Sequence, residues 1–150
     1  MITPHFLEPS RALRLVWLLE ILGTPSRLQT YCRHPDTLLA PDELKAIHPL
    51  GKSPLLDDDG FILAESGAIT DYLIQTYGNG RLMPERGSRE YWQYQRWLHY
   101  AEGSLMPLLL LGLVFRRIES APMPFFVKPI ARKISSSVKS SFIHPQAALH

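Results

Sequence analysis

The stretch that decides the fold is "HPLGKSPLLDDDGFILAESGAITDYLIQTYG", residues 48–78. Two leucines follow Pro54, and an Asp-Gly pair at 59–60 separates them from a second apolar run, "FILAE". Short apolar runs joined by Asp-Gly are typical of a β-hairpin, and the first residue of a strand tolerates proline. The segment "SGAITDYLIQTYG" then predicts a helix that ends at Gly78. The stretch therefore predicts strand, strand and helix.

The residues before this stretch predict two more strands, each followed by a helix. "MITPHFL" predicts a strand, and the apolar periodicity of "PSRALRLVWLLEILG" predicts a helix that Gly23 closes. "SRLQTYCR" predicts a second strand, and "PDTLLAPDELKAIHP" predicts a loop with one short helix between Pro41 and Pro49. The order β-α-β-α-β-β-α predicts a compact α/β domain over residues 1–78.

The residues after Gly78 predict an all-helical domain. Residues 79–87 have the composition of a linker. "SREYWQYQRWLHYAEGSLMPLLLLGLVFRRIES" is long enough for one extended helix, which Gly103 and Pro107 are expected to bend. "FFVKPIARKISSSVKSSF" predicts a second helix and "HPQAALH" the first turns of a third, so the helical domain covers residues 88–150.

Composition and cysteine content favour a cytoplasmic globular protein. Hydrophobic residues make up 45% and charged residues 20% of the sequence, which disfavours disorder. Cys32 is the only cysteine, so an internal disulfide is excluded; its place inside a predicted strand favours a buried, inert thiol. The first ten residues do not resemble a signal peptide. The longest apolar run, residues 105–115, is shorter than the ~20 residues of a membrane span, so we expect none.

Charge and histidine spacing exclude other classes. Residues 121–150 hold four basic and no acidic residues, a pattern suited to an anionic surface. These residues alternate with apolar ones at helical spacing, so a solvated helix face also explains them, and we expect no nucleic-acid partner. The six histidines lack metal-ligand spacing, and the acidic residues 57–59 lack the later glutamate of a calcium loop. We therefore expect no metal.

Three motifs together resemble the glutathione transferase superfamily, and most closely its bacterial and fungal members with a serine-arginine pair before the first helix. They are "EPSRALRLVWLLEILG", "HPLGKSPLL" and "AESGAITDYLIQTYG". Each is weak alone, but their order and spacing are specific, and the resemblance covers residues 1 to about 120. It implies an α/β thioredoxin-like N-terminal domain that binds glutathione, followed by an all-α C-terminal domain that supplies the second substrate's pocket. It also implies a homodimer and a role in detoxification.

The all-α domain is expected to be truncated. Members of this family usually continue with several further helices, whereas this sequence ends in what resembles an early turn of one. We therefore expect a fragment. If 150 residues were the whole protein, apolar helix faces in residues 85–143 would lack their cover, which predicts poor solubility or a compensating dimer contact.

Ser10 is the candidate catalytic residue. A thiol with a pKa of about 8.5 is only a few per cent ionised at pH 7, and lowering it by about two units requires about 2.7 kcal/mol. A helix N-terminus supplies roughly 0.3–1 kcal/mol, whereas a hydrogen bond to a charged group supplies roughly 1.5–3 kcal/mol. A Ser10 hydroxyl that donates to the sulfur would supply the difference. The alternative is that Ser10 is an ordinary N-cap. Its neighbour Arg11 either adds positive potential or is solvated.

The second candidate site is Lys52, Ser53 and Pro54. The resemblance implies a cis peptide before Pro54, with the main chain of Ser53, rather than its hydroxyl, pairing with the cysteinyl part of glutathione. Lys52 would reach the glycine carboxylate of the peptide, or would be a solvated loop lysine.

The third candidate site is Glu65 and Ser66. Ser66 opens the predicted helix, where the amides and the helix dipole favour an anion such as the γ-glutamyl carboxylate, and Glu65 would hold the γ-glutamyl amine. Position 69 is Ile69, so the capping box that would need Glu or Gln there is missing. The alternative is an ordinary helix cap.

These residues predict a glutathione transferase that activates the glutathione thiolate for attack on a small apolar electrophile. Glutathione-dependent peroxide reduction stays open beside it. No single residue is assigned to the electrophile. The alternative is a non-catalytic module of the same fold that dimerises or binds other proteins. An oxidoreductase with its own cysteine is disfavoured because Ser10 stands where such enzymes carry cysteine.

Overall fold

The computed structural model describes residues 1–8, 10, 12–122 and 127–143, and the third predicted helix lies outside them. Contacts divide the chain into the units Met1–Gln95 and Arg96–His150. The division falls inside a helix. Tyr94, in the part of that helix within the first unit, packs against the core of this unit; its hydroxyl donates to Asp71 at 3.2 Å, and burial raises its pKa to about 12. The predicted domain boundaries at residues 78 and 88 stay a prediction.

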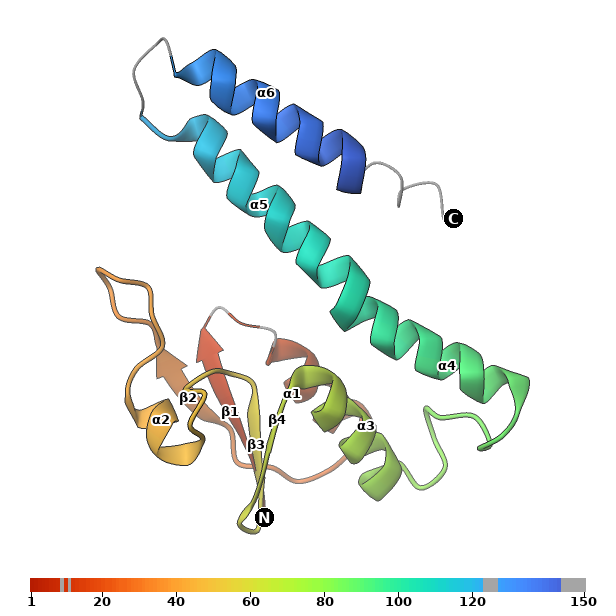
Figure 1. The fold of residues 1–150 in the computed structure, drawn as a ribbon. Coiled ribbons are helices and arrows are strands. Elements are labelled where there is room, and N and C mark those ends of the chain that lie inside the picture. Colours follow the sequence, from red (N-terminus) through yellow and green to blue (C-terminus); the bar gives the residue numbers. More distant parts are fainter. Residues whose placement is uncertain (9, 11, 123–126, 144–150) are drawn as a thin grey trace. The chain divides into compact units, whose positions relative to one another are not determined.

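Residues 1–78 of the first unit form a four-stranded sheet with three helices, in the predicted order (Figure 1). The strands β1 (Ile2–Glu8), β2 (Gln29–Cys32), β3 (Leu55–Asp58) and β4 (Phe61–Ala64) are arranged β2-β1-β3-β4. Strand β2 runs parallel to β1, whereas β3 is antiparallel to both β1 and β4. The helices are α1 (Leu13–Leu22), α2 (Glu43–Ile47) and α3 (Ser66–Tyr77). The predicted thioredoxin-like architecture is confirmed.

The core lies on both faces of the sheet because side chains alternate along each strand. Leu56 of β3 packs with residues of α1 and α3, among them Leu15 and Leu73. The next side chain along the strand, Leu55, packs on the opposite face with Leu44 of α2. Helices α1 and α3 therefore cover one face and α2 covers the other (Figure 1).

Turn chemistry fixes the hairpin as predicted. Asp59 and Gly60 have φ values of 49° and 92°, so both central residues of the turn are left-handed. This conformation is tolerated best by Gly, Asn and Asp. The carboxylate of Asp57 accepts the Gly60 N–H at 2.7 Å, which stabilises the turn. The first helix likewise ends at a left-handed glycine, Gly23, with φ 68°.

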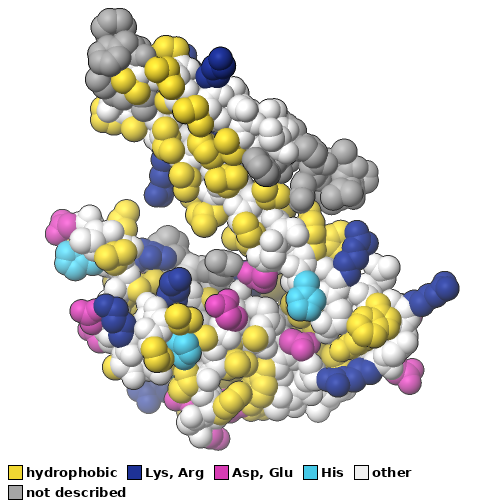
Figure 2. Space-filling model, viewed as in Figure 1, with side chains coloured by type: hydrophobic (Ala, Val, Ile, Leu, Met, Phe, Trp, Pro, Cys, Tyr) yellow, Lys and Arg dark blue, Asp and Glu magenta, His cyan; other side chains and the backbone are white. Residues whose placement is uncertain are grey.

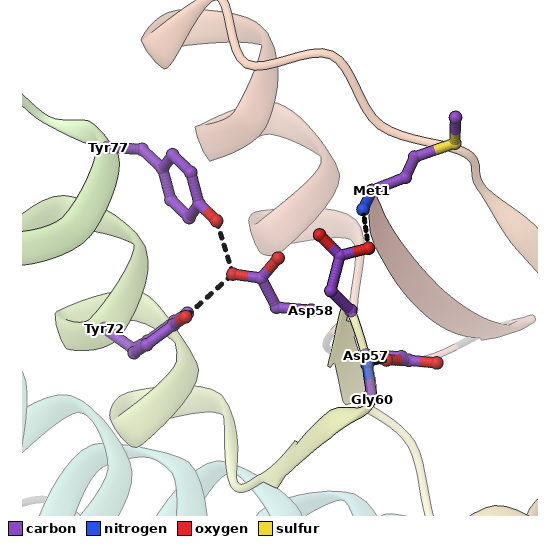
Figure 3. Close-up of polar contacts among 7 residues, drawn as sticks. Met1, Asp57, Asp58, Gly60, Tyr72 and Tyr77 are labelled. Atoms are coloured by element: carbon purple, nitrogen blue, oxygen red, sulfur yellow. Dashed lines mark hydrogen bonds and ion pairs between the residues drawn. The ribbon is translucent and has the colours of Figure 1, made fainter.

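Two tyrosines attach α3 to the hairpin (Figure 3). Tyr72 donates to the carboxylate of Asp58 at 2.7 Å, and Tyr77 donates to the same oxygen. The hydrogen bond from Tyr77, followed by that from Tyr72, lowers the pKa of Asp58. Beside them, the N-terminal amine of Met1 pairs with Asp59. These contacts hold the C-terminal half of α3 against the turn of the hairpin.

The expected burial of Cys32 is wrong. Cys32 is the last residue of β2 and is exposed. Strand β2 is an edge strand, paired only with β1 through a register that ends at Glu8 and Cys32. A residue at the end of an edge strand has no neighbouring strand to cover it, so its thiol contacts solvent.

The helical segment begins within the first unit and continues through the second. Helix α4 (Arg89–Tyr100) passes through a π-helical turn (Ala101–Leu105) into α5 (Met106–Ser120). Gly103 lies in this π turn and Pro107 follows it, so the regular hydrogen bonding is interrupted where a bend was predicted. Helix α6 (Lys128–Val138) packs beside α5, and Lys139 pairs with Glu119 at 2.8 Å.

The apolar faces of these helices are exposed, as expected. Figure 2 shows hydrophobic side chains gathered along α5 and α6. They include Leu109, Leu110, Leu113, Ile130 and Ile134. By length and composition alone, the helix Arg89–Ser120 is also long and apolar enough to cross a membrane. The expectation of no membrane span, which rested on one uninterrupted run, therefore stays a prediction.

Candidate functional site

Two adjoining pockets in the first unit contain all six predicted site residues. The larger, of about 580 Å³, is lined by Ser10, Lys52 and Ser53 among others. The smaller, of about 130 Å³, is lined by Lys52, Ser53, Pro54, Glu65 and Ser66 with Leu50, Leu55 and Ala64. Leu50, Lys52 and Ser53 line both pockets. The larger volume is within the usual range for a small-molecule site.

Ser10 lies between the end of β1 and the start of α1. Helix α1 begins at Leu13, so Ser10 lies three residues before the first helical residue. Its Oγ accepts the N–H of Ala12 at 3.2 Å. Ser10 therefore caps the turn that leads into α1, but as an acceptor it keeps its own proton for donation. Its neighbour Arg11 lies outside the described residues.

Ser53 stands directly before β3, and the Ser53–Pro54 peptide is cis, as the resemblance implied. Pro54 is buried and Ser53 is half-buried. The Ser53 hydroxyl donates to the carbonyl of His5 at 3.0 Å and accepts the N–H of Leu7 at 3.2 Å. It also lies 3.4 Å from the Ser10 Oγ. The sequence analysis assigned no role to the Ser53 hydroxyl, whereas in the structure it makes three polar contacts.

Glu65 and Ser66 meet at the start of α3, where the sequence predicted the helix to begin. Ser66 is the first helical residue and is 5% exposed, whereas Glu65 is exposed. Glu65 has φ 73° and ψ 119°, a conformation that costs a residue with a Cβ roughly 1–3 kcal/mol. No acidic side chain occupies the first turn, and the Glu65 side chain does not cap the helix. No acidic side chain at the start of α3 therefore accepts a hydrogen bond from the N–H groups of its first turn.

Cationic residues in the larger pocket were missed by sequence reasoning. Arg33, which follows β2, and Lys45 of α2 line it together with Lys52. Lys45 pairs with Asp42 at 2.7 Å, and Arg33 donates to the carbonyl of Leu38 at 3.0 Å. Their sequence neighbourhoods carry no motif, and the loop that follows α2 brings Lys52 near them. Three cations around one pocket favour an anionic ligand.

The described ranges 1–8, 10, 12–122 and 127–143 hold no group of three or more His, Cys, Asp or Glu side chains arranged for a metal ion. The expectation of no metal stays a prediction.

Of the aromatic residues on the long helix, Trp97 is 51% exposed and stacks edge-on against Tyr100, with ring centroids 5.6 Å apart.

Comparison with known proteins identifies the same family from independent directions. Residues 10–76 match the family model described as glutathione S-transferase, N-terminal domain. Glutathione S-transferase 1 of Saccharomyces cerevisiae is 36% identical over 148 residues, covering 95% of this chain and 63% of the yeast protein. The chain thus spans less than two thirds of that relative.

Solved structures agree in fold. A glutathione S-transferase from Actinobacillus pleuropneumoniae aligns with a TM-score of 0.69 and 33% identity, covering 94% of this chain and 64% of that one. A glutathione transferase homolog from Lodderomyces elongisporus, solved with two GSH per subunit, aligns with a TM-score of 0.69 over 94% of this chain and 67% of that one. At 19% identity the second likeness shows the fold alone.

Proposed function

Because the chain belongs to the glutathione transferase superfamily, we propose that it binds glutathione in the two adjoining pockets and stabilises the thiolate for attack on a small apolar electrophile. One observation carries the proposal. Ser10, Ser53 and Ser66 come from three separate segments and line one pair of adjoining pockets.

The chemistry of each end of the pockets suits one part of the tripeptide. At the start of α3, Ser66 and the first-turn amides receive the γ-glutamyl carboxylate, and Glu65 holds the γ-glutamyl amine. The cations of the larger pocket, Lys52 foremost, attract the glycine carboxylate. The main chain of Ser53, before Pro54, pairs with the cysteinyl part between them.

Ser10 then stabilises the anion on sulfur. Its hydroxyl accepts from Ala12 and has its proton to donate, and a hydrogen bond to a charged group contributes roughly 1.5–3 kcal/mol. The thiol proton leaves to solvent, and the sulfur lone pair forms a C–S bond as the electrophile's leaving group departs with its electron pair. The same thiolate also attacks a peroxide; a second glutathione then completes the disulfide, and the peroxide becomes an alcohol and water. We further propose a cytoplasmic homodimer with a role in detoxification.

Retention on immobilised glutathione followed by a thiol-addition assay tests this proposal. With a chlorinated nitroaromatic substrate, Ser10→Ala is expected to reduce kcat/KM by about ten- to a hundredfold. Ser136→Ala is the matched control, because among the described residues the hydroxyl of Ser136 bonds the carbonyl of Lys133, within α6. Retention without turnover by the unsubstituted protein would instead favour the non-catalytic module. An unchanged rate in Ser10→Ala would remove Ser10 from the reaction.

A further inference from the structure

The start of β3 leaves a gap beside β1. Paired residues of the two strands stop at His5 and Leu55, because Leu55 is the first residue of β3. Strand β1 continues to Glu8, so the Leu7 N–H has no strand residue opposite it on this side. Leu7 is buried, and a buried N–H needs a partner. The Ser53 hydroxyl supplies it, accepting from Leu7 while donating to the carbonyl of His5.

Because the hydroxyl of Ser53 bonds β1, its main chain does not. In a regular antiparallel strand the backbone of residue 53 would pair with Leu7. Here the Ser53 hydroxyl, and not its backbone, accepts the Leu7 N–H. Within the described ranges, no hydrogen bond uses the Ser53 N–H or C=O. The hydroxyl thus completes the sheet and leaves the peptide groups of Ser53 available at the pocket wall.

The donors and acceptors also fix the contact with Ser10. A hydroxyl has one proton and two acceptor lone pairs. The proton of Ser53 goes to His5, and one lone pair takes the Leu7 N–H, so one lone pair remains. The Ser10 Oγ lies 3.4 Å from it and, in turn, already accepts from Ala12. Ser10 is therefore the donor, with its proton directed to Ser53.

We infer that Ser53 is a positioning residue whose hydroxyl holds the catalytic hydroxyl of Ser10 at the pocket wall. At 3.4 Å the contact is longer than a typical hydrogen bond between two hydroxyls, so it is weak and gives way when a stronger acceptor arrives. A thiolate is such an acceptor, and Ser10 exchanges Ser53 for sulfur by rotating its O–H. The inference rests on the proposed function and adds a residue that acts through Ser10.

A double-mutant cycle on the full chain tests this, with the pKa of bound glutathione and kcat/KM as readouts. Ser53→Ala is expected to raise the thiol pKa by about half a unit to one unit and to reduce kcat/KM about three- to tenfold. Ser53→Thr keeps the hydroxyl and is expected to recover most of both losses. In a Ser10→Ala background, Ser53→Ala is expected to change the thiol pKa by less than about 0.3 unit and kcat/KM by less than about twofold.

Two results would overturn the inference. One is a wild-type thiol pKa in Ser53→Ala, and the other is an equal loss in both backgrounds, which would mean that Ser53 acts independently of Ser10. If Ser10→Ala itself leaves the thiol pKa unchanged, the proposed function fails first. Amide hydrogen exchange separates the structural step: without glutathione, Ser53→Ala should accelerate exchange of the Leu7 N–H, and an unchanged rate would contradict the ladder contact.

Discussion

The two units of the chain differ in how they bury apolar side chains. Every buried hydrophobic residue among the described positions lies between Ile2 and Ile74, in the first unit. In the described part of the second unit, the buried residue is Ser135, while leucines and isoleucines of α5 and α6 are about half exposed. The first unit has a closed core on both faces of its sheet, whereas the helices present apolar faces to solvent.

This difference separates the two halves of the proposed reaction. Both pockets with the predicted glutathione residues are built on the closed core, by the sheet and the starts of α1 and α3. Glutathione binding and thiolate stabilisation are therefore expected to depend on the first unit. Recognition of the apolar electrophile is expected to depend on side chains of the helical segment.

Core truncation gives the largest expected effect and tests the comparison directly. Leu73 of α3 is fully buried, so Leu73→Ala is expected to reduce the free energy of unfolding by about 2–5 kcal/mol. Leu113→Ala is the matched change on α5, where the side chain is 47% exposed, and should cost less than about 1 kcal/mol. Urea unfolding followed by circular dichroism measures both. Equal losses would mean that the helices also have a closed core.

A substitution at Ser66 tests whether glutathione binding depends on the first unit. Ser66→Ala removes a buried hydroxyl at the start of α3 and is expected to raise the KM for glutathione about two- to tenfold, with kcat within about twofold. The reason is that the carboxylate contact is the same in the bound substrate and in the transition state. Ser136→Ala on α6 should leave KM unaltered. A fall in kcat at constant KM would assign Ser66 to the chemistry instead.

Lys52 is expected to contribute less because it is exposed. Lys52→Met should raise the KM for glutathione by roughly two- to fivefold at low salt, and the effect should shrink as ionic strength rises. Lys133→Met, an exposed lysine of α6, is the control for a general change of net charge. If both variants behave alike, Lys52 is a solvated loop lysine.

The smallest expected effect is the pH dependence of the Asp58 contacts. Because hydrogen bonds from Tyr77 and Tyr72 lower its folded pKa, Asp58 stabilises the fold above its unfolded pKa of about 3.9. This contribution is lost as pH falls through the lowered folded value. The stability difference between the unsubstituted protein and Asp58→Asn should therefore be present at pH 7 and shrink below about pH 4. Asp36→Asn, which changes an exposed loop carboxylate, is the control for the loss of one acidic side chain.

The fold and the positions of the site residues were largely predictable because they depend on local sequence. Proline before two leucines marked the start of β3, Asp-Gly marked the turn, and Ser66 marked the first residue of α3. Each of these signals restricts the backbone dihedral angles of one or two residues, so each can be read from a few neighbouring residues in the sequence.

What could not be predicted depends on contacts between distant segments. The Ser53 hydroxyl meets His5 and Leu7 only because β1 is longer than β3, and strand lengths are the least certain part of a prediction. The exposure of Cys32 likewise depends on β2 being at the edge of the sheet. Arg33 and Lys45 carry no motif and join the pocket through the packing of a loop.

Ultraviolet titration of the thiolate in the complex with glutathione tests the central claim most directly. The account predicts an ionisation midpoint about one to two pH units below that of free glutathione, because Ser10 and the turn before α1 favour the anion. A midpoint equal to that of the free peptide would contradict it.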